Sequence, residues 1–173
     1  MYLVPNPRDK RLMALRGLAR AQGMSVQITT VAKLDPSAAE RVSAGGKALQ
    51  PKTDCAGYKL PVGKKLSVKG EVMLIKLPPA PSVVVNEVLP GVALSADSDK
   101  QLWQRYNAQG IASTLIEDAF DRLPEDTLAI AIERHNVVCF WQEKAKPDAG
   151  QVEIIKEVLE SLRADLQARF GTS

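Results

Sequence analysis

The fold is decided by one stretch of sequence, TLAIAIERHNVVCFWQE at residues 127–143, which predicts a β-hairpin. Two apolar runs flank His135-Asn136, a pair that suits a tight turn because Asn adopts positive φ more readily than most residues. The turn sets residues of the two strands opposite each other: Ile132 with Cys139, and Ile130 with Trp141. A second apolar set points the other way: Ala129, Ala131, Val138 and Phe140. Because both faces are apolar, we expect the hairpin to lie inside a sheet that protein covers on both sides.

A long helix is predicted after the hairpin. Asp148 and Gln151 have the spacing of a capping box, in which each side chain bonds the backbone N–H of the other residue. Apolar side chains then recur every three or four positions, as on a helix with one buried face: Val152, Ile155, Leu159, Leu162 and Leu166. Replacing Leu159 with Asp should therefore unfold or aggregate the protein.

A second helix is predicted before the hairpin. Ser98 and Gln101 have capping-box spacing, and an apolar helical stripe continues from there to Pro124. Gly110 lies in the middle of this stretch, where a glycine weakens a helix. We expect one long helix with a kink near Gly110.

The N-terminal part reads as a helix and a strand. Asn6 is a good helix cap, and Pro7 suits the first helical position, so a helix should run from Pro7 to about Gln22 and stop at Gly23. Residues 25–31 alternate apolar and polar side chains, which predicts a strand with Val26 and Ile28 on its buried face.

The middle of the chain is less regular. Glycines and prolines interrupt residues 32–69, where we expect only a short helix at 35–42. The apolar run at 71–77 predicts a strand, 83–85 is a further candidate strand, and 86–96 should form a loop. Together the elements predict an α+β fold, a layered helix/sheet domain with a C-terminal β-hairpin followed by a helix. A chain of 173 residues has the size of one domain, so we expect a single domain.

Charge divides the chain into two halves. The basic half, residues 1–86, holds 14 Lys and Arg against 5 Asp and Glu, whereas the acidic half, residues 87–173, holds 9 against 15. Such an asymmetry concerns partners more than fold.

No run approaches the roughly 20 apolar residues that cross a bilayer. We therefore expect a soluble protein. Cys55 and Cys139 are far apart in sequence and lack the spacing of a metal site, which indicates a reducing compartment. Whether the two cysteines form a disulfide stays open.

Residue types that carry catalysis or bind metals form no recognisable motif. His135, the only histidine, should be exposed in its turn. Residues 43–47, SAGGK, lack the order and context of a phosphate loop, and the acidic residues at 117–126 lack the spacing of a calcium loop. We therefore assign no catalytic residue, metal or cofactor, and the sequence leans against an enzyme without excluding one.

The basic half suggests an anionic partner. The first helix carries five residues that we assign to binding an anionic surface: Arg8, Lys10, Arg11, Arg16 and Arg20. Further lysines follow in the middle of the chain: Lys59, Lys64, Lys65, Lys69 and Lys76. Nucleic acid is the less favoured surface, because Tyr2 and Tyr58 are the only aromatic residues of this half that could stack on bases. We favour an anionic membrane, to which each basic residue contributes about 1 kcal/mol.

An intramolecular explanation of the charge asymmetry stays open. The basic half could face the acidic half of the same molecule, or that of a neighbouring copy in a homo-oligomer. On the membrane interpretation Arg16 and Arg20 are exposed, so replacing both with Glu should leave the free energy of unfolding almost unchanged.

Three stretches of the chain carry a resemblance: Pro5–Leu12 with Leu15-Arg16 and Gly23, then Tyr58–Pro61, then Trp141–Lys144. They resemble a group of small uncharacterised single-pass bacterial membrane proteins, in which the first stretch directly follows the membrane helix. The resemblance implies a location, a cytoplasmic domain behind an N-terminal anchor, and assigns no activity or catalytic residue. Residues 1–5, MYLVP, are either the end of a removed anchor or a native start.

Together these observations predict a non-enzymatic interaction module at the cytoplasmic face of a bacterial membrane, which contacts an unknown protein partner while its basic helix lies towards lipid. Two alternatives remain. A small hydrolase or transferase for an anionic substrate would show a deep cleft where Lys, Asp and Cys or Ser converge. An RNA-binding accessory domain would show a continuous basic groove.

Overall fold

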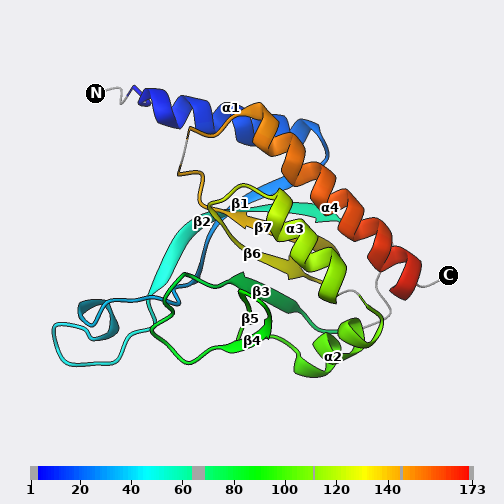
Figure 1. Cartoon of the computed structure of the whole chain (residues 1–173). Coiled ribbons are helices and arrows are strands. Elements are labelled where there is room, and N and C mark those ends of the chain that lie inside the picture. The colour runs from blue at the N-terminus through cyan, green and yellow to red at the C-terminus, as the bar shows by residue number, and fades with distance from the viewer. Residues whose placement is uncertain (1–3, 64–68, 111, 145, 172–173) are drawn as a thin grey trace.

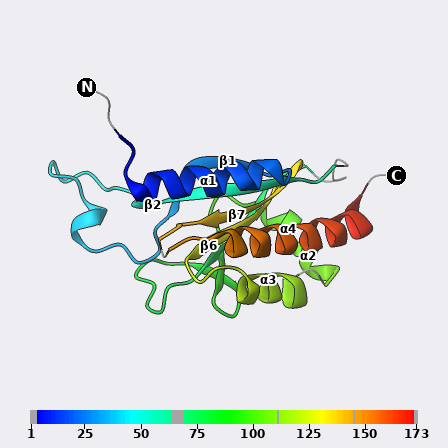
Figure 2. The ribbon, with the colours of Figure 1, turned by 90° about the horizontal axis from the view of Figure 1, so that it is seen from above.

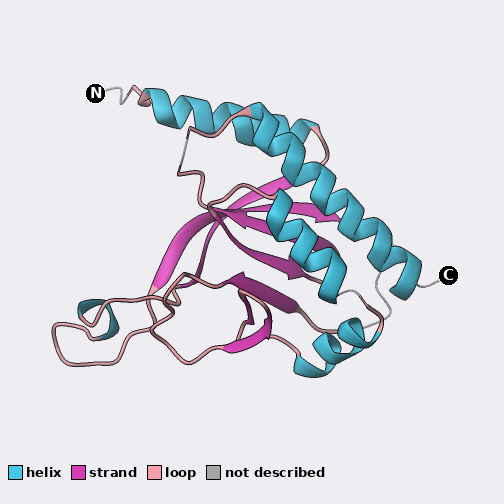
Figure 3. Ribbon diagram, in the orientation of Figure 1, coloured by secondary structure: helices cyan, strands magenta, loops and turns pink. Residues whose placement is uncertain are grey.

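One antiparallel sheet organises the chain in the computed structural model, which describes residues 4–63, 69–110, 112–144 and 146–171. The strands are β1 (Ser25–Ala32), β2 (Lys52–Pro61), β3 (Val72–Lys76), β4 (Asn86–Leu89), β5 (Val92–Leu94), β6 (Thr127–Ile132) and β7 (Asn136–Trp141). Their order across the sheet is β1-β2-β7-β6-β3-β5-β4, and every neighbouring pair is antiparallel. The helices are α1 (Pro7–Ala21), α2 (Lys100–Ala108), α3 (Glu117–Arg122) and α4 (Ala149–Phe170) (Figure 3). The predicted α+β class, with a hairpin followed by a helix, is confirmed.

The helices pack on one face of the sheet (Figures 1 and 2). α4 contacts α1, α3 and the central strands β2 and β7. The largest fully buried side chains of the described part belong to the cluster between helices and sheet: Trp141, Tyr58, Tyr106, Leu74, Ile116, Ile130, Ile132, Ile155, Leu159, Leu162 and Leu166. The predicted apolar stripe of α4 is confirmed, since each of its five residues is at most 2% exposed.

The opposite face of the sheet carries a smaller buried cluster: Val31, Cys55, Ile75, Ala129, Ala131, Val138 and Phe140. Gly57 of β2 lies in this face, and a Cβ there would stand 3.4 Å from the Phe140 ring. The missing side chain leaves room for that ring. Both faces of the β6–β7 hairpin are therefore buried, as its two apolar sets predict.

The register of this hairpin differs from the prediction. Glu133 N donates to Asn136 O at 2.9 Å, and Asn136 Nδ2 donates to Glu133 Oε2 at 3.2 Å, so the turn residues are Arg134-His135. The observed pairs are Ile132 with Val137, and Ile130 with Cys139. The predicted pairing was two residues out because Asn136 belongs to β7 instead of the turn. A shift of two residues leaves every side chain on its predicted face.

Local capping side chains start α1, α2 and α4, but the residue that caps α2 is not the predicted one. Asn6 accepts from Asp9 N at 2.8 Å, and Asp148 and Gln151 form the complete capping box. At the second predicted helix the cap is Asp99, which accepts from Leu102 N at 3.0 Å. The neighbouring Ser98 hydroxyl instead bonds the backbone of β3, so the capping box predicted there was wrong.

The second predicted helix is broken into three pieces. α2 ends at Ala108, a π-helical turn spans Ala112–Ile116, and α3 follows. Gly110 between them has φ +77°, which an L-residue rarely adopts. The expected kink near Gly110 is a full interruption.

Two strand regions were wrongly predicted. β2 lies inside the segment expected to be irregular, because Gly57 and the polar residues of its other face hide the apolar alternation of Ala56, Tyr58 and Leu60. β4 and β5 form a hairpin in the predicted loop at 86–96, whereas 83–85 is not a strand. Pro90-Gly91, with φ +73° at the glycine, is the turn signal that the prediction overlooked.

β1 is an edge strand with an unexpected exposed residue. Val26 is partly buried against the main cluster, but Ile28 is 61% exposed, so its predicted burial was wrong. An edge strand has a neighbour on one side only, which explains why its apolar residues are incompletely covered.

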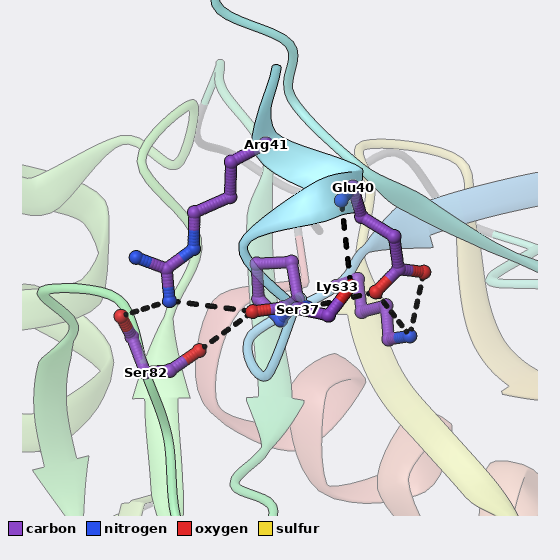
Figure 4. Close-up of polar contacts among 6 residues, drawn as sticks. Lys33, Ser37, Glu40, Arg41 and Ser82 are labelled. Atoms are coloured by element: carbon purple, nitrogen blue, oxygen red, sulfur yellow. Dashed lines mark hydrogen bonds and ion pairs between the residues drawn. The ribbon is translucent and has the colours of Figure 1, made fainter. Parts of the chain in front are cut away.

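The loop after β1 is held by polar contacts (Figure 4). Lys33 Nζ lies 2.9 Å from Oε1 of Glu40, which is part of a short 3₁₀ turn at Ala39–Arg41. Arg41 Nη2 donates to Ser82 O at 2.8 Å and thereby ties this loop to the loop after β3. The short helix predicted at 35–42 is reduced to that turn.

Candidate functional site

A buried carboxylate stands where α1 crosses the end of β7. Glu143 is 3% exposed and accepts from Arg16 Nε at 3.1 Å and Arg16 Nη2 at 2.5 Å. Tyr58 Oη donates to its Oε1 at 2.7 Å. We call these three residues the Glu143 centre. It joins α1, β2 and the segment after β7, so every part comes from a different element.

The backbone and rings around the centre fix its geometry. Glu143 has φ +55°, the only positive φ of a non-glycine residue in the described part of the chain. This sharp bend turns the chain from β7 back under α1. The Tyr58 ring packs on Trp141 with centroids 5.6 Å apart, and the Trp141 indole donates to Asp126 Oδ1 at 2.7 Å.

The electrostatics of the centre favour structure over catalysis. The hydrogen bonds that Arg16 donates to Glu143 raise the pKa of Arg16 above its usual value. Burial, and then the bond to Glu143, raise the pKa of Tyr58 far above 10, so the phenol stays neutral and donates. The carboxylate, bonded by both partners, locks α1 onto the sheet.

A cationic notch lies beside this centre. The notch has a volume of about 410 Å³ and is lined by Arg8, Arg11, Lys144, Lys146 and Pro147. Arg8 Nη2 donates to Glu143 O at 3.2 Å, and Lys144 N donates to Asp126 Oδ2 at 2.8 Å, which positions both walls. Lys144 is the last residue of the landmark Trp141–Lys144 and Lys146 follows it, but only the fold brings the two lysines to α1.

The five predicted binding residues of α1 separate into two groups. Four of them are exposed: Arg8, Lys10, Arg11 and Arg20. The fifth, Arg16, points inward onto Glu143, and its side chain is only 23% exposed. The prediction that Arg16 is exposed was wrong, because its partner lies 127 residues away and leaves no trace in the local pattern.

Little of the charge asymmetry is balanced across the two halves. Among the described residues, two ion pairs join the basic half to the acidic half: Arg16–Glu143 and Lys59–Glu133. Lys64 and Lys65 of the cationic middle segment lie outside the described residues. The excess of positive charge on α1 therefore faces solvent.

The cysteines lie on opposite faces of the sheet and are both free. Burial raises the pKa of Cys55 to about 11 and that of Cys139 to about 12. A nucleophilic cysteine needs a thiolate near neutral pH. The enzyme alternative accordingly loses its two thiols as candidate nucleophiles, and His135 lies exposed in its turn as expected.

Two further cavities open on the face of the sheet away from the helices. One of about 580 Å³ lies between the loops after β1 and β3, and one of about 370 Å³ lies beside it. Charges of both signs line the larger one: Lys33, Asp35, Lys76, Glu125, Asp126 and Lys144. The acidic side chains of this lining offset its lysines, so this cavity carries less net positive charge than the notch.

Among the described residues, no group of three or more His, Cys, Asp or Glu is placed to hold a metal ion. No helix in the part of the chain that the structure covers is both long and apolar enough to cross a bilayer.

Comparisons with known proteins add a fold likeness. No protein-family model matches the chain, and no curated protein does. The crystal structure of the mycobacterial trehalose monomycolate transport factor A, TtfA, is similar over 98% of this chain and 99% of its own, with 10% identity and a TM-score of 0.48. A similarity of that size supports no statement about function.

Proposed function

We propose that this protein is a non-enzymatic interaction module whose α1 side lies against an anionic membrane surface while another part of the chain contacts a protein partner. The observation that carries the proposal is the gathering of exposed cations from two distant segments: Arg8, Lys10, Arg11 and Arg20 from α1, with Lys144 and Lys146 from the segment after β7. The adjacent Glu143 carboxylate is already neutralised by Arg16, so it does not cancel this charge.

The size of the attraction indicates a reversible contact. Six exposed cations, offset by Asp9, contribute about 5 kcal/mol at an anionic surface, which corresponds to submillimolar affinity. Stable attachment therefore needs a second element, either a membrane anchor joined to the N-terminal side of α1 or the protein partner. We place this surface at the cytoplasmic leaflet, the location that the resemblance noted in the sequence implies.

Vesicle flotation tests the proposal. The purified chain should float with vesicles rich in phosphatidylglycerol, remain behind with neutral phosphatidylcholine vesicles, and detach as salt rises to physiological strength. Arg134→Glu reverses one charge in the exposed turn at the far end of the β6–β7 hairpin, away from α1. It should bind anionic vesicles almost as well as wild type. Equal flotation with neutral vesicles, or none with anionic vesicles at low salt, would refute the membrane contact.

A further inference from the structure

The cationic notch has the features of a site for one compact anion. It gathers four cations, Arg8, Arg11, Lys144 and Lys146, and no acidic side chain lines it among the described residues. Four like charges that line one notch repel one another, and an anion between them relieves that repulsion. A surface that only needed general positive charge could spread the four cations apart.

The notch is also held in shape before any ligand arrives. Arg8 is fixed to the Glu143 carbonyl, and the Lys144 amide is fixed to Asp126. Pro147, which also lines the notch, is buried, and its ring fixes its own backbone φ. Preorganised donors lose less conformational entropy on binding, which favours a specific ligand over a diffuse surface contact.

The neighbouring carboxylates are occupied elsewhere. Glu143 is bonded by Arg16 and Tyr58, and Asp126 by the Trp141 indole and the Lys144 amide. Neither can swing into the notch without leaving a buried donor unpaired. The charge of the notch is consequently available to a ligand.

We infer that the notch binds a phosphate monoester, an inference that rests on the proposed membrane contact and names the group recognised there. Guanidinium groups match the oxygens of a phosphate in pairs, and lysines add point charge. A monoester carries up to two negative charges and suits four cations better than the single charge of a phosphodiester. The monoester can belong to a lipid headgroup such as phosphatidic acid or to a free phosphate compound.

The test combines a soluble probe with two kinds of vesicle. Calorimetry with glycerol 3-phosphate measures the soluble source, and sedimentation with phosphatidic acid or phosphatidylglycerol vesicles of matched surface potential measures the lipid source. Lys144→Gln combined with Lys146→Gln removes two notch cations that are exposed and makes no change to the core. Lys10→Gln combined with Arg20→Gln removes the same charge from α1 outside the notch.

We expect tighter binding to phosphatidic acid vesicles than to phosphatidylglycerol vesicles, and a loss of affinity for phosphatidic acid in the notch variant that is at least about tenfold greater than the loss in the control variant. The control variant should lose clearly less affinity than the notch variant, both for glycerol 3-phosphate and for phosphatidic acid vesicles. Equal binding to both kinds of vesicle, with equal losses of affinity in both variants, would overturn the proposed phosphate site. The proposed membrane contact would still stand.

Other outcomes separate the two proposals further. Binding of glycerol 3-phosphate that depends on the notch, without binding to either vesicle, would support the notch with a soluble ligand and refute the membrane contact. A short single-stranded RNA that binds through the same lysines more tightly than either phosphate source would overturn the inference, as would the absence of all binding.

Discussion

Arg16 shows how one contact decides what a residue can do. Its guanidinium neutralises the buried Glu143, so Arg16→Glu would place a second carboxylate against the first. Breaking a buried ion pair in this way costs about 3 kcal/mol, at the low end of the range because Arg16 keeps some contact with solvent. Chemical denaturation of wild type and variant measures the change in the free energy of unfolding.

The matched control is Arg20→Glu, on the same helix but exposed. Its free energy of unfolding should differ from wild type by less than about 0.5 kcal/mol. Two variants with the same small effect would show that the Glu143 centre does not stabilise the fold. This replaces the expectation from sequence that both positions tolerate Glu.

The contacts of Glu40 predict how the stability of its loop depends on pH. Bonds from Lys33 and from Ser37 lower the pKa of this carboxyl from 4.5 to about 2. A lowered pKa in the folded state means that the contact stabilises its loop above about pH 4.5 and loses that effect as the pH falls towards 2. A titration followed by carboxyl ¹³C NMR should show the low midpoint in wild type and a midpoint nearer 4.5 in Lys33→Ala. An ordinary midpoint in wild type would contradict the contact.

The two cysteines should resist labelling in the native state. Both thiols are buried, and their pKa values are raised to about 11 and about 12. A thiol reagent at neutral pH should therefore react with neither cysteine until denaturant is added. Rapid reaction of one thiol in native buffer would show that the sheet opens locally at that strand.

At the scale of elements, α4 carries the firmest prediction. Leu159 is fully buried in the middle of its apolar stripe, so Leu159→Asp removes that packing and buries a charge. The expected loss is at least about 3 kcal/mol, enough to unfold or aggregate a domain of ordinary stability. Thermal melting followed by circular dichroism measures it.

Ser161→Asp is the control for that variant, since it adds the same carboxylate two residues further on at an exposed position. It should melt within a few degrees of wild type. An unchanged melting transition in Leu159→Asp would instead contradict the packing of α4 against the sheet.

The elements that were predicted correctly carry local sequence signals, such as capping residues, within or next to their own residues. α1 and α4 begin at Asn6 and Asp148, whose side chains bond the first turn directly. β2 has no comparable signal, because one of the two strands that it pairs with, β7, comes much later in the chain. The β4–β5 hairpin did carry a readable Pro-Gly turn, and its omission was an error of interpretation.

At the scale of the whole molecule, the site could be predicted only in part. The cations of α1 are visible in sequence, but Lys144 and Lys146 join them only through the path of β7. The pairing of Arg16 with Glu143 could not be predicted either, since nothing in the sequence indicates that these two residues meet. Long-range pairing of this kind follows from topology, which periodicity does not supply.

The central claim is that the α1 end of the molecule faces an anionic membrane. Val4 precedes α1 and is 77% exposed, whereas Val84 lies in the loop after β3 and is fully exposed. Val4→Cys and Val84→Cys thus provide a matched pair of labelling sites, and the native thiols are buried. A polarity-sensitive fluorophore on each reports which end of the chain meets the vesicle surface.

The measurement is the emission of each labelled variant on vesicles rich in phosphatidylglycerol, with neutral vesicles for comparison. We predict a blue shift for the label at Val4 on anionic vesicles only, reversed by salt, and no shift for the label at Val84. A shift at Val84 alone, or equal shifts at both positions, would contradict the account.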